Sequence, residues 1–251
     1  MTPFSKSPWV LLSALFWACT LSADDFSKHA EPLRSLRDIK RAPSQTDNIW
    51  IGELPLNCYS ALVKFANLKH VSFHRKNGEG ADDQRLQVLS GLGFTNLFDV
   101  GLLNCPRVTD RGIRALTNLP ALRFLQLEGT AITDAGCSLL AGTSTVTGVN
   151  ASYCTNVTRI GILALARSPT VRELGFSLDQ IDKKEVPEII DSMSSGSYCI
   201  IVDPKGELNS NELKQRGQTR GIQVVLQAQG ALPGFLGERP RPWSSEREKG
   251  K

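Results

Sequence analysis

Hydrophobic and polar residues follow a two-part pattern that repeats about every 25 residues through the middle of the chain. Each unit opens with apolar residues two positions apart, which is the period of a strand with one buried face. It continues with apolar residues three to five positions apart, which suits the buried stripe of a short helix. A strand and helix that recur at a fixed interval predict a solenoid. The four clearest units begin at Leu97, Leu122, Val146 and Val171.

The second unit, LRFLQLEGTAITDAGCSLL, shows the change from strand to helix most plainly. A Thr-Asp pair lies at the junction, and we expect the carboxylate of Asp134 to cap the free N–H groups of the first helical turn. The third unit carries Arg159 at this position, so its helix is expected to be the least well capped. In the fourth unit Asp182 and Glu185 have the spacing of a capping box.

The stretches VTDRGIRALTNLPALRFLQL and LRFLQLEGTAITDAGCSLL resemble leucine-rich repeats of the cysteine-containing type. That pattern has Leu-x-x-Leu-x-Leu-x-x-Cys, then Ile-Thr-Asp, then Gly and a helical Leu-x-x-Leu. The match is good over 97–140, fair over 146–165 and weak over 171–190, and residues 68–92 form a degenerate unit with a polar insertion, HRKNGEGADDQ. The chain resembles bacterial exported leucine-rich-repeat proteins and the repeat half of F-box proteins. This resemblance implies an α/β leucine-rich-repeat solenoid, with short parallel strands on the concave face and short helices on the convex face.

The resemblance also assigns Cys105, Thr130 and Cys154 to the ladder position that follows each strand. A small side chain there faces inward and bonds to neighbouring backbone. The two cysteines are two units apart, a separation of roughly 9 to 10 Å between strands, whereas a disulfide needs Cα atoms within about 7 Å. Cys137 falls on a helix stripe and is expected in the core. We therefore predict buried, unpaired thiols.

The first 23 residues have the layout of a secretory signal peptide, with one cation, a short apolar run and small residues before two Asp residues. The apolar run is short for a membrane span. Cleavage after Ser22 or Ala23 is expected, and the alternatives are an uncleaved membrane anchor and lipid attachment at Cys19. We therefore expect an exported protein that is periplasmic, extracellular or anchored at the surface.

Composition shifts divide the rest of the chain. A polar stretch precedes the repeats, and a solenoid needs caps because its end units would otherwise expose their core. The C-terminal residues are rich in proline, glycine and charge. The predicted parts are a signal peptide at 1–23, a linker at 24–48, an N-terminal cap at 49–67, leucine-rich repeats at 68–195, a C-terminal cap at 196–229 and a disordered tail at 230–251.

Charge and motifs exclude several classes of function. The net charge is only +4 and the basic residues are scattered, which does not favour nucleic-acid binding. The sequence lacks the nucleophile elbow, the phosphate-binding glycine loops and the His-Glu-x-x-His zinc motif. Neither the three histidines nor the cysteines have metal-site spacing. We therefore expect no enzymatic activity, no cofactor and no metal ion.

The strand residues between the buried leucines are the candidate binding surface, because they point to the concave face of a leucine-rich solenoid. Aromatic residues beside arginine are typical of interface hot spots. The candidates are Phe98, Asp99, Arg123, Phe124, Gln126, Glu128, Asn150, Arg172 and Glu173. The leading hypothesis is an exported, non-catalytic module that binds an unknown protein partner. The alternative is a cytosolic substrate-recognition subunit of a ubiquitin-ligase-like complex, although no F-box is visible before the repeats.

Overall fold

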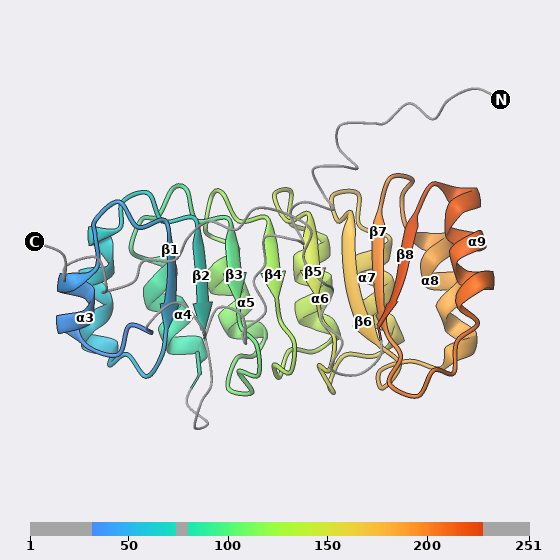
Figure 1. Ribbon diagram of the computed structural model, residues 1–251, viewed down its shortest axis with the longest axis horizontal. Helices are drawn as coiled ribbons and strands as arrows, with labels where there is room; N and C mark the ends of the chain where they lie inside the picture. The colour runs from blue at the N-terminus through green and yellow to red at the C-terminus, as the bar shows by residue number, and fades with distance from the viewer. Residues whose placement is uncertain (1–31, 74–79, 228–251) are drawn as a thin grey trace, which may run out of the picture.

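The computed structural model describes residues 32–73 and 80–227, and its centre is one sheet of eight parallel strands in sequence order (Figure 1). Each strand pairs with the strand of the next unit, so all connections run in one direction along the molecule. The strands are β1 (Asn48–Ile51), β2 (His70–Phe73), β3 (Asp99–Gly101), β4 (Phe124–Gln126), β5 (Gly148–Asn150), β6 (Glu173–Ser177), β7 (Tyr198–Val202) and β8 (Gln223–Gln227).

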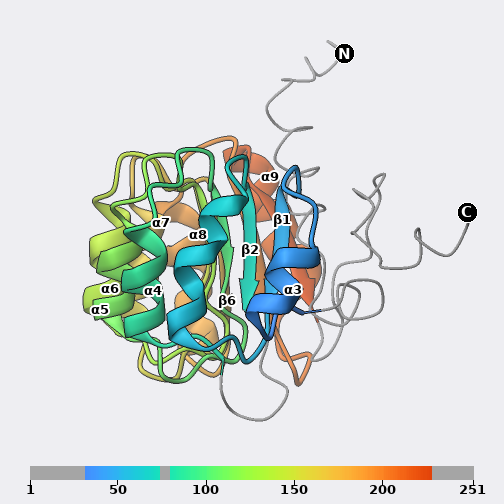
Figure 2. The same ribbon diagram turned by 90° about the vertical axis from the view of Figure 1, so that its left-hand side faces the viewer.

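The repeat helices α4 to α8 line one side of this sheet, as the view along the molecule shows (Figure 2). This arrangement confirms the predicted α/β leucine-rich-repeat solenoid. The helical elements are α3 (Leu36–Arg41), η1 (Leu56–Lys64), α4 (Asp83–Ser90), α5 (Asp110–Leu116), α6 (Asp134–Ala141), α7 (Arg159–Ala166), η2 (Lys183–Glu185), α8 (Val186–Ser192) and α9 (Ser210–Arg220).

The core is a continuous stack of apolar side chains between the sheet and the helices. The central residues of β3 to β6, which pair with one another across the sheet, are at most 1% exposed. From the other side, apolar residues of the repeat helices complete each layer, including Ile113, Cys137 and Ile162. Burying one such aliphatic side chain stabilises the fold by about 1.5 to 3 kcal/mol, so stability is distributed along the solenoid.

Threonine, rather than aspartate, caps helices α5, α6 and α7. The hydroxyl groups of Thr109, Thr133 and Thr158 accept hydrogen bonds from backbone N–H groups of the first turn at 3.2 to 3.3 Å. Helix α7 is therefore capped in the same way as its neighbours, and the prediction that it would be the least well capped is wrong. The threonine is the N-cap residue, just before the helix, whereas the aspartate is the first residue of the helix. A side chain at the N-cap position reaches the free N–H groups of the first turn.

The aspartate that begins α4, α5 or α6 bonds to the next unit instead. Asp134 accepts hydrogen bonds from the backbone N–H and the hydroxyl of Thr158 at 2.8 and 2.7 Å, and from Gly161 N at 2.9 Å. Asp83 makes the same three contacts two units earlier, and Asp110, in the unit between them, bonds to the backbone N–H and the hydroxyl of Thr133. A Cβ atom at Gly161 would lie 2.5 Å from Asp134 Oδ1. The recurring Thr-Asp-x-Gly sequence is thus a link between successive repeats.

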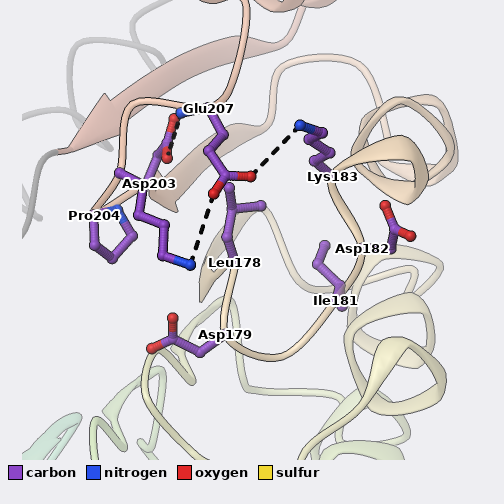
Figure 3. A pocket seen from close by; sticks show the side chains of 9 residues that line it. Leu178, Asp179, Ile181, Asp182, Lys183, Asp203, Pro204 and Glu207 are labelled. Carbon is purple, nitrogen blue, oxygen red and sulfur yellow. Dashed lines mark hydrogen bonds and ion pairs between the residues drawn. The ribbon is translucent and has the colours of Figure 1, made fainter.

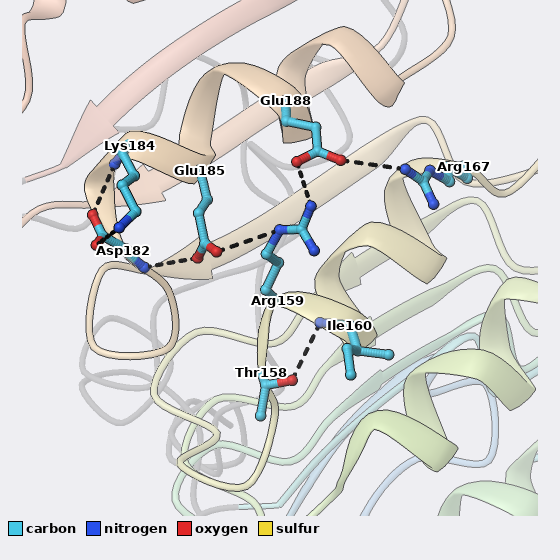
Figure 4. A network of polar contacts seen from close by, with 8 residues as sticks. All are labelled: Thr158, Arg159, Ile160, Arg167, Asp182, Lys184, Glu185 and Glu188. Carbon is cyan, nitrogen blue, oxygen red and sulfur yellow. Dashed lines mark hydrogen bonds and ion pairs between the residues drawn. The ribbon is translucent and has the colours of Figure 1, made fainter.

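Arg159 ends this series and joins α7 to α8 through charge (Figure 4). Its guanidinium group pairs with Glu185 at 3.4 Å and with Glu188, which also contacts Arg167 at 3.4 Å. These side chains are partly exposed, so the pairs add little stability. The predicted capping box of Asp182 and Glu185 is present.

The ladder position after the strands behaves as expected. The Thr130 hydroxyl donates to Leu127 O at 2.7 Å, and the Cys154 thiol contacts the same carbonyl oxygen at 2.9 Å. The Cys105 thiol contacts Leu103 O at 3.6 Å. None of the five cysteines in the described part of the chain forms a disulfide bond, and all except Cys58 are buried.

The end segments are folded layers of the same stack. Leu33, Ile39 and Ala42 are buried, and Leu33 bridges to β1, so the described part of the predicted linker is a structured N-terminal layer with helix α3. This short helix has charged residues on both sides of its one buried residue, Ile39, so its sequence lacks the apolar periodicity that predicts a helix. At the other end β7, α9 and β8 form a strand–helix–strand unit, with Asn209 as the N-cap of α9. The predicted signal peptide and C-terminal tail lie outside the described residues.

Candidate functional site

The face of the sheet opposite the repeat helices is the candidate site, and we call it the open face. Side chains alternate along a strand, so the residues on either side of each buried central residue project from this face. Strand register aligns them in two cross-strand rows. The first row is His70, Asp99, Phe124, Gly148, Glu173 and Tyr198, and the second is Ser72, Gly101, Gln126, Asn150, Gly175 and Ile200.

The structure places the nine candidate residues in three groups. Asp99, Phe124 and Glu173 share the first row, and Gln126 and Asn150 share the second row. The other four lie just outside the strands: Phe98, Arg123 and Arg172 precede them, and Glu128 follows β4. Adjacent residues such as 98 and 99 cannot both point to one face of a strand, which separates the groups.

Three residues of the first row, His70, Gly148 and Tyr198, were missing from the sequence-based set. Aligning Val71 with Val100 would have placed His70 opposite Asp99, as the register does. Tyr198 was assigned to the C-terminal cap and therefore excluded, although β7 continues the sheet.

His70 contacts both Asp99 and the ring of Phe98. Asp99 Oδ2 lies 3.1 Å from His70 Nδ1, and the imidazole ring of His70 meets the ring of Phe98 edge-on, with centroids 4.7 Å apart. Asp99 is buried, and its other oxygen, Oδ1, has no hydrogen-bond partner among the described residues. The contact with His70 therefore satisfies only half of this carboxyl group.

Glu173 is a buried acid of the open face with a strongly raised pKa. It is only 3% exposed, and its Oε2 atom has no hydrogen-bond partner within the described part of the chain. Burial, with a smaller contribution from the negative charge of Asp99, raises the pKa of Glu173 to about 8. The carboxyl group is thus held in an environment that disfavours its own charge.

Gly148 lets the ring of Phe124 approach the backbone of β5 in the middle of the first row. A Cβ atom at Gly148 would lie 2.6 Å from Cδ1 of the Phe124 ring and 3.4 Å from Glu173 Cβ. The ring therefore occupies the space beside Gly148 on β5 that a larger side chain would fill.

The second row ends in a polar network. Asn150 Nδ2 donates to Glu128 Oε1 at 2.6 Å, and Asn150 Oδ1 accepts from the backbone and hydroxyl of Ser152 at 3.1 and 2.8 Å. Burial raises the pKa of Glu128, while the hydrogen bond from Asn150 opposes this shift. The amide thus ties the segment after β4 to the end of β5.

A polar pocket of about 260 Å³ lies where β6 and β7 end (Figure 3). Both of its lysines pair with one acid: Lys183 and Lys205 lie 3.6 and 3.8 Å from the carboxylate of Glu207. Asp203 accepts hydrogen bonds from the backbone N–H groups of Glu207 and Leu208. These contacts have a structural role, and no nucleophile with an adjacent base lines the pocket within the described residues.

Other chemical groups are inert in this setting. Burial raises the pKa of the Cys199 thiol to about 12 and also raises the pKa of Cys137, which disfavours the reactive thiolate. Residues 32–73 and 80–227 contain no cluster of three His, Cys, Asp or Glu side chains suited to a metal ion. In the same residues, no helix has both the length and the apolar character needed to cross a membrane.

No protein-family model matches the chain, and none of the curated proteins matches it by sequence. Among solved structures, the tropomodulin C-terminal domain of Caenorhabditis elegans has a TM-score of 0.38 and 14% identity, covering 66% of this chain and 90% of that one. A chain of the yeast Rad7 and Elc1 complex has a TM-score of 0.43 and 14% identity, covering 74% of this chain. This chain spans 56% of the length of that yeast chain. The repeat geometry of the molecule itself therefore defines its fold.

Proposed function

We propose that this protein is a non-catalytic module that binds a protein partner on the open face of its sheet. The observation that carries the proposal is the pair of cross-strand rows. They place aromatic and polar side chains from consecutive strands on one rigid surface, while the repeat helices occupy the opposite side. A surface of this kind offers area and varied chemistry without the convergent groups that a reaction needs.

A pull-down of crosslinked partners tests the face assignment. Phe124→Asp places a charge in the first row, and Ile160→Asp makes the matched change on the helix side, where Ile160 is 67% exposed. Partner recovery is expected to fall at least tenfold with Phe124→Asp and to remain unchanged with Ile160→Asp, because a buried interface charge costs about 2 kcal/mol or more. Urea unfolding of both variants separates lost binding from lost folding. Equal recovery with folded Phe124→Asp refutes the assignment.

We propose further that the protein acts outside the cytosol, on the basis of the signal-like layout of residues 1–23. The comparison is between a C-terminally tagged full chain and the same chain without residues 1–23. Export of the full chain, with retention of the shortened chain, is the expected result. Cytosolic retention of both forms would instead favour the ubiquitin-ligase-like alternative.

A further inference from the structure

Two buried carboxyl groups in the first row each retain an oxygen atom that accepts no hydrogen bond from the described residues. These atoms are Asp99 Oδ1 on β3 and Glu173 Oε2 on β6. Asp99 is 6% exposed and Glu173 is 3% exposed. A buried acceptor without a donor is costly, and the cost is larger for a charged group. Both positions therefore favour a donor supplied from outside the described sheet.

The strand register sets the distance between the Cα atoms of these two acids. Asp99 pairs with Phe124, Phe124 with Gly148 and Gly148 with Glu173, so three strand spacings separate the acids. At about 4.8 Å for each spacing, their Cα atoms are about 14 Å apart along the row. A single small ion cannot bond to both carboxyl groups over that span unless the side chains converge, and the described residues offer no third ligand there.

We propose that the first row binds an extended peptide segment of a partner protein that carries two cationic side chains four residues apart. An extended chain rises about 3.3 to 3.4 Å per residue, so side chains at positions i and i+4 lie on the same side about 13 to 14 Å apart. This distance matches the separation of Asp99 and Glu173. The segment lies across the strands, with one cation on each acid, and the apolar surface of Phe124 faces the residues between them.

Arginine is the cation that fits these acceptors best. Its guanidinium group stays charged, donates from a planar fork and forms bidentate contacts with carboxylates. A lysine ammonium group carries a tighter hydration shell, which must be removed at a buried acceptor. The recognised sequence is therefore Arg-x-x-x-Arg in an extended segment. This inference rests on the proposed function and specifies the chemistry of the partner.

Anisotropy titration of the full chain with two labelled peptides tests the spacing. The probes are Gly-Arg-Gly-Ser-Gly-Arg-Gly, with arginines four apart, and Gly-Arg-Gly-Arg-Gly-Ser-Gly, with arginines two apart. Measurements are made at low salt and above the raised pKa of Glu173, where its carboxyl group is ionised. The first probe is expected to bind at least tenfold more tightly, because only its arginines reach both acids. Equal affinities overturn the proposal.

Charge-removing variants test the residues. Glu173→Gln and Asp99→Asn keep the side-chain size and are each expected to weaken binding of the first probe about 10- to 100-fold, the range for losing a charged hydrogen-bond partner. Glu212→Gln removes an exposed acid from α9 and is expected to leave the affinity unchanged. Unaltered affinity in both row variants contradicts the proposal.

The chain's own C-terminal residues contain the same spacing, because Arg247 and Lys251 are four apart. A full chain with Arg247→Gln and Lys251→Gln distinguishes this source of cations from a partner. Equal probe affinity for wild type and this double variant supports a partner segment. Probe binding that occurs only in the double variant overturns the partner assignment. If the probes fail while Phe124→Asp still abolishes partner recovery, the peptide inference fails and the proposed function stands.

Discussion

Replacing Glu173 by Gln is expected to stabilise the protein, and the gain depends on pH. The ordinary pKa of a glutamate is 4.5, and in the folded chain the pKa of Glu173 is raised to about 8. The unfolded chain therefore releases this proton more readily than the folded chain does. Because the folded chain holds this proton more tightly, the contribution of Glu173 to the free energy of unfolding decreases as pH rises from 4.5 to 8. The decrease is complete above the pKa of the folded chain.

The size of the effect follows from the two pKa values. At pH 7 the difference corresponds to about 3 kcal/mol, using about 1.4 kcal/mol per pKa unit. If the sheet relaxes to admit water to the carboxylate, the effect falls toward about 1 kcal/mol. Glutamine keeps the shape of the side chain and carries no charge. The gain in the free energy of unfolding from Glu173→Gln is therefore near zero at pH 4.5, between about 1 and 3 kcal/mol at pH 7, and largest above pH 8.

Urea unfolding of wild type and Glu173→Gln at several pH values between 4.5 and 8.5 measures this difference directly. All other ionisable groups are common to both proteins, so subtraction isolates Glu173. The exposed-acid variant Glu212→Gln serves as control and is expected to stay within about 0.5 kcal/mol of wild type throughout. A stability difference that does not change with pH, or a Glu173→Gln protein that is less stable at pH 8, would refute the reasoning about burial.

Three further predictions concern the links between repeats and the thiols. Gly161→Ala should lower the free energy of unfolding by about 1 to 3 kcal/mol, since its Cβ would meet Asp134 Oδ1 at 2.5 Å. Gly142→Ala, whose Cβ would have no neighbour nearer than 3.7 Å, is the matched control and should not destabilise; equal losses in urea unfolding contradict the link. Asp134→Ala removes the acceptor for two backbone N–H groups and one hydroxyl, so a loss of about 2 to 4 kcal/mol is expected, and a loss below about 0.5 kcal/mol would mean that these bonds do not join the repeats. With a thiol reagent, Cys58 should react in the native protein, whereas Cys154 should react only on unfolding. Rapid reaction of Cys154 in a native Cys58→Ser variant would show that the Cys154 thiol is accessible to solvent and would contradict its burial.

Hydrophobic periodicity was sufficient to predict the solenoid, because each strand and helix buries one face and the interval repeats. The inward position of Cys105, Thr130 and Cys154 also followed from the pattern. The role of Asp134 did not, since its partners Thr158 and Gly161 belong to the next unit. Contacts between repeats depend on how units stack, which the sequence of one unit does not reveal.

The candidate surface was predictable only in outline. Alternation along a strand identifies a face once the strand limits are known, but short strands leave those limits open by one residue. That single position displaced His70 from the candidate set and added Phe98 to it. The burial of Glu173 was also invisible in sequence, because burial depends on how the neighbouring strands and their side chains pack around it.

The central claim is that partners bind the open face, and photocrosslinking from defined positions tests it most directly. A benzophenone amino acid is placed at Gln126, in the second row, or at Ser138, on the exposed side of helix α6. Each full-length protein is then irradiated in its native cells. The account predicts a discrete crosslinked partner from position 126 and none from position 138. A partner captured from position 138 and absent from position 126 would contradict it.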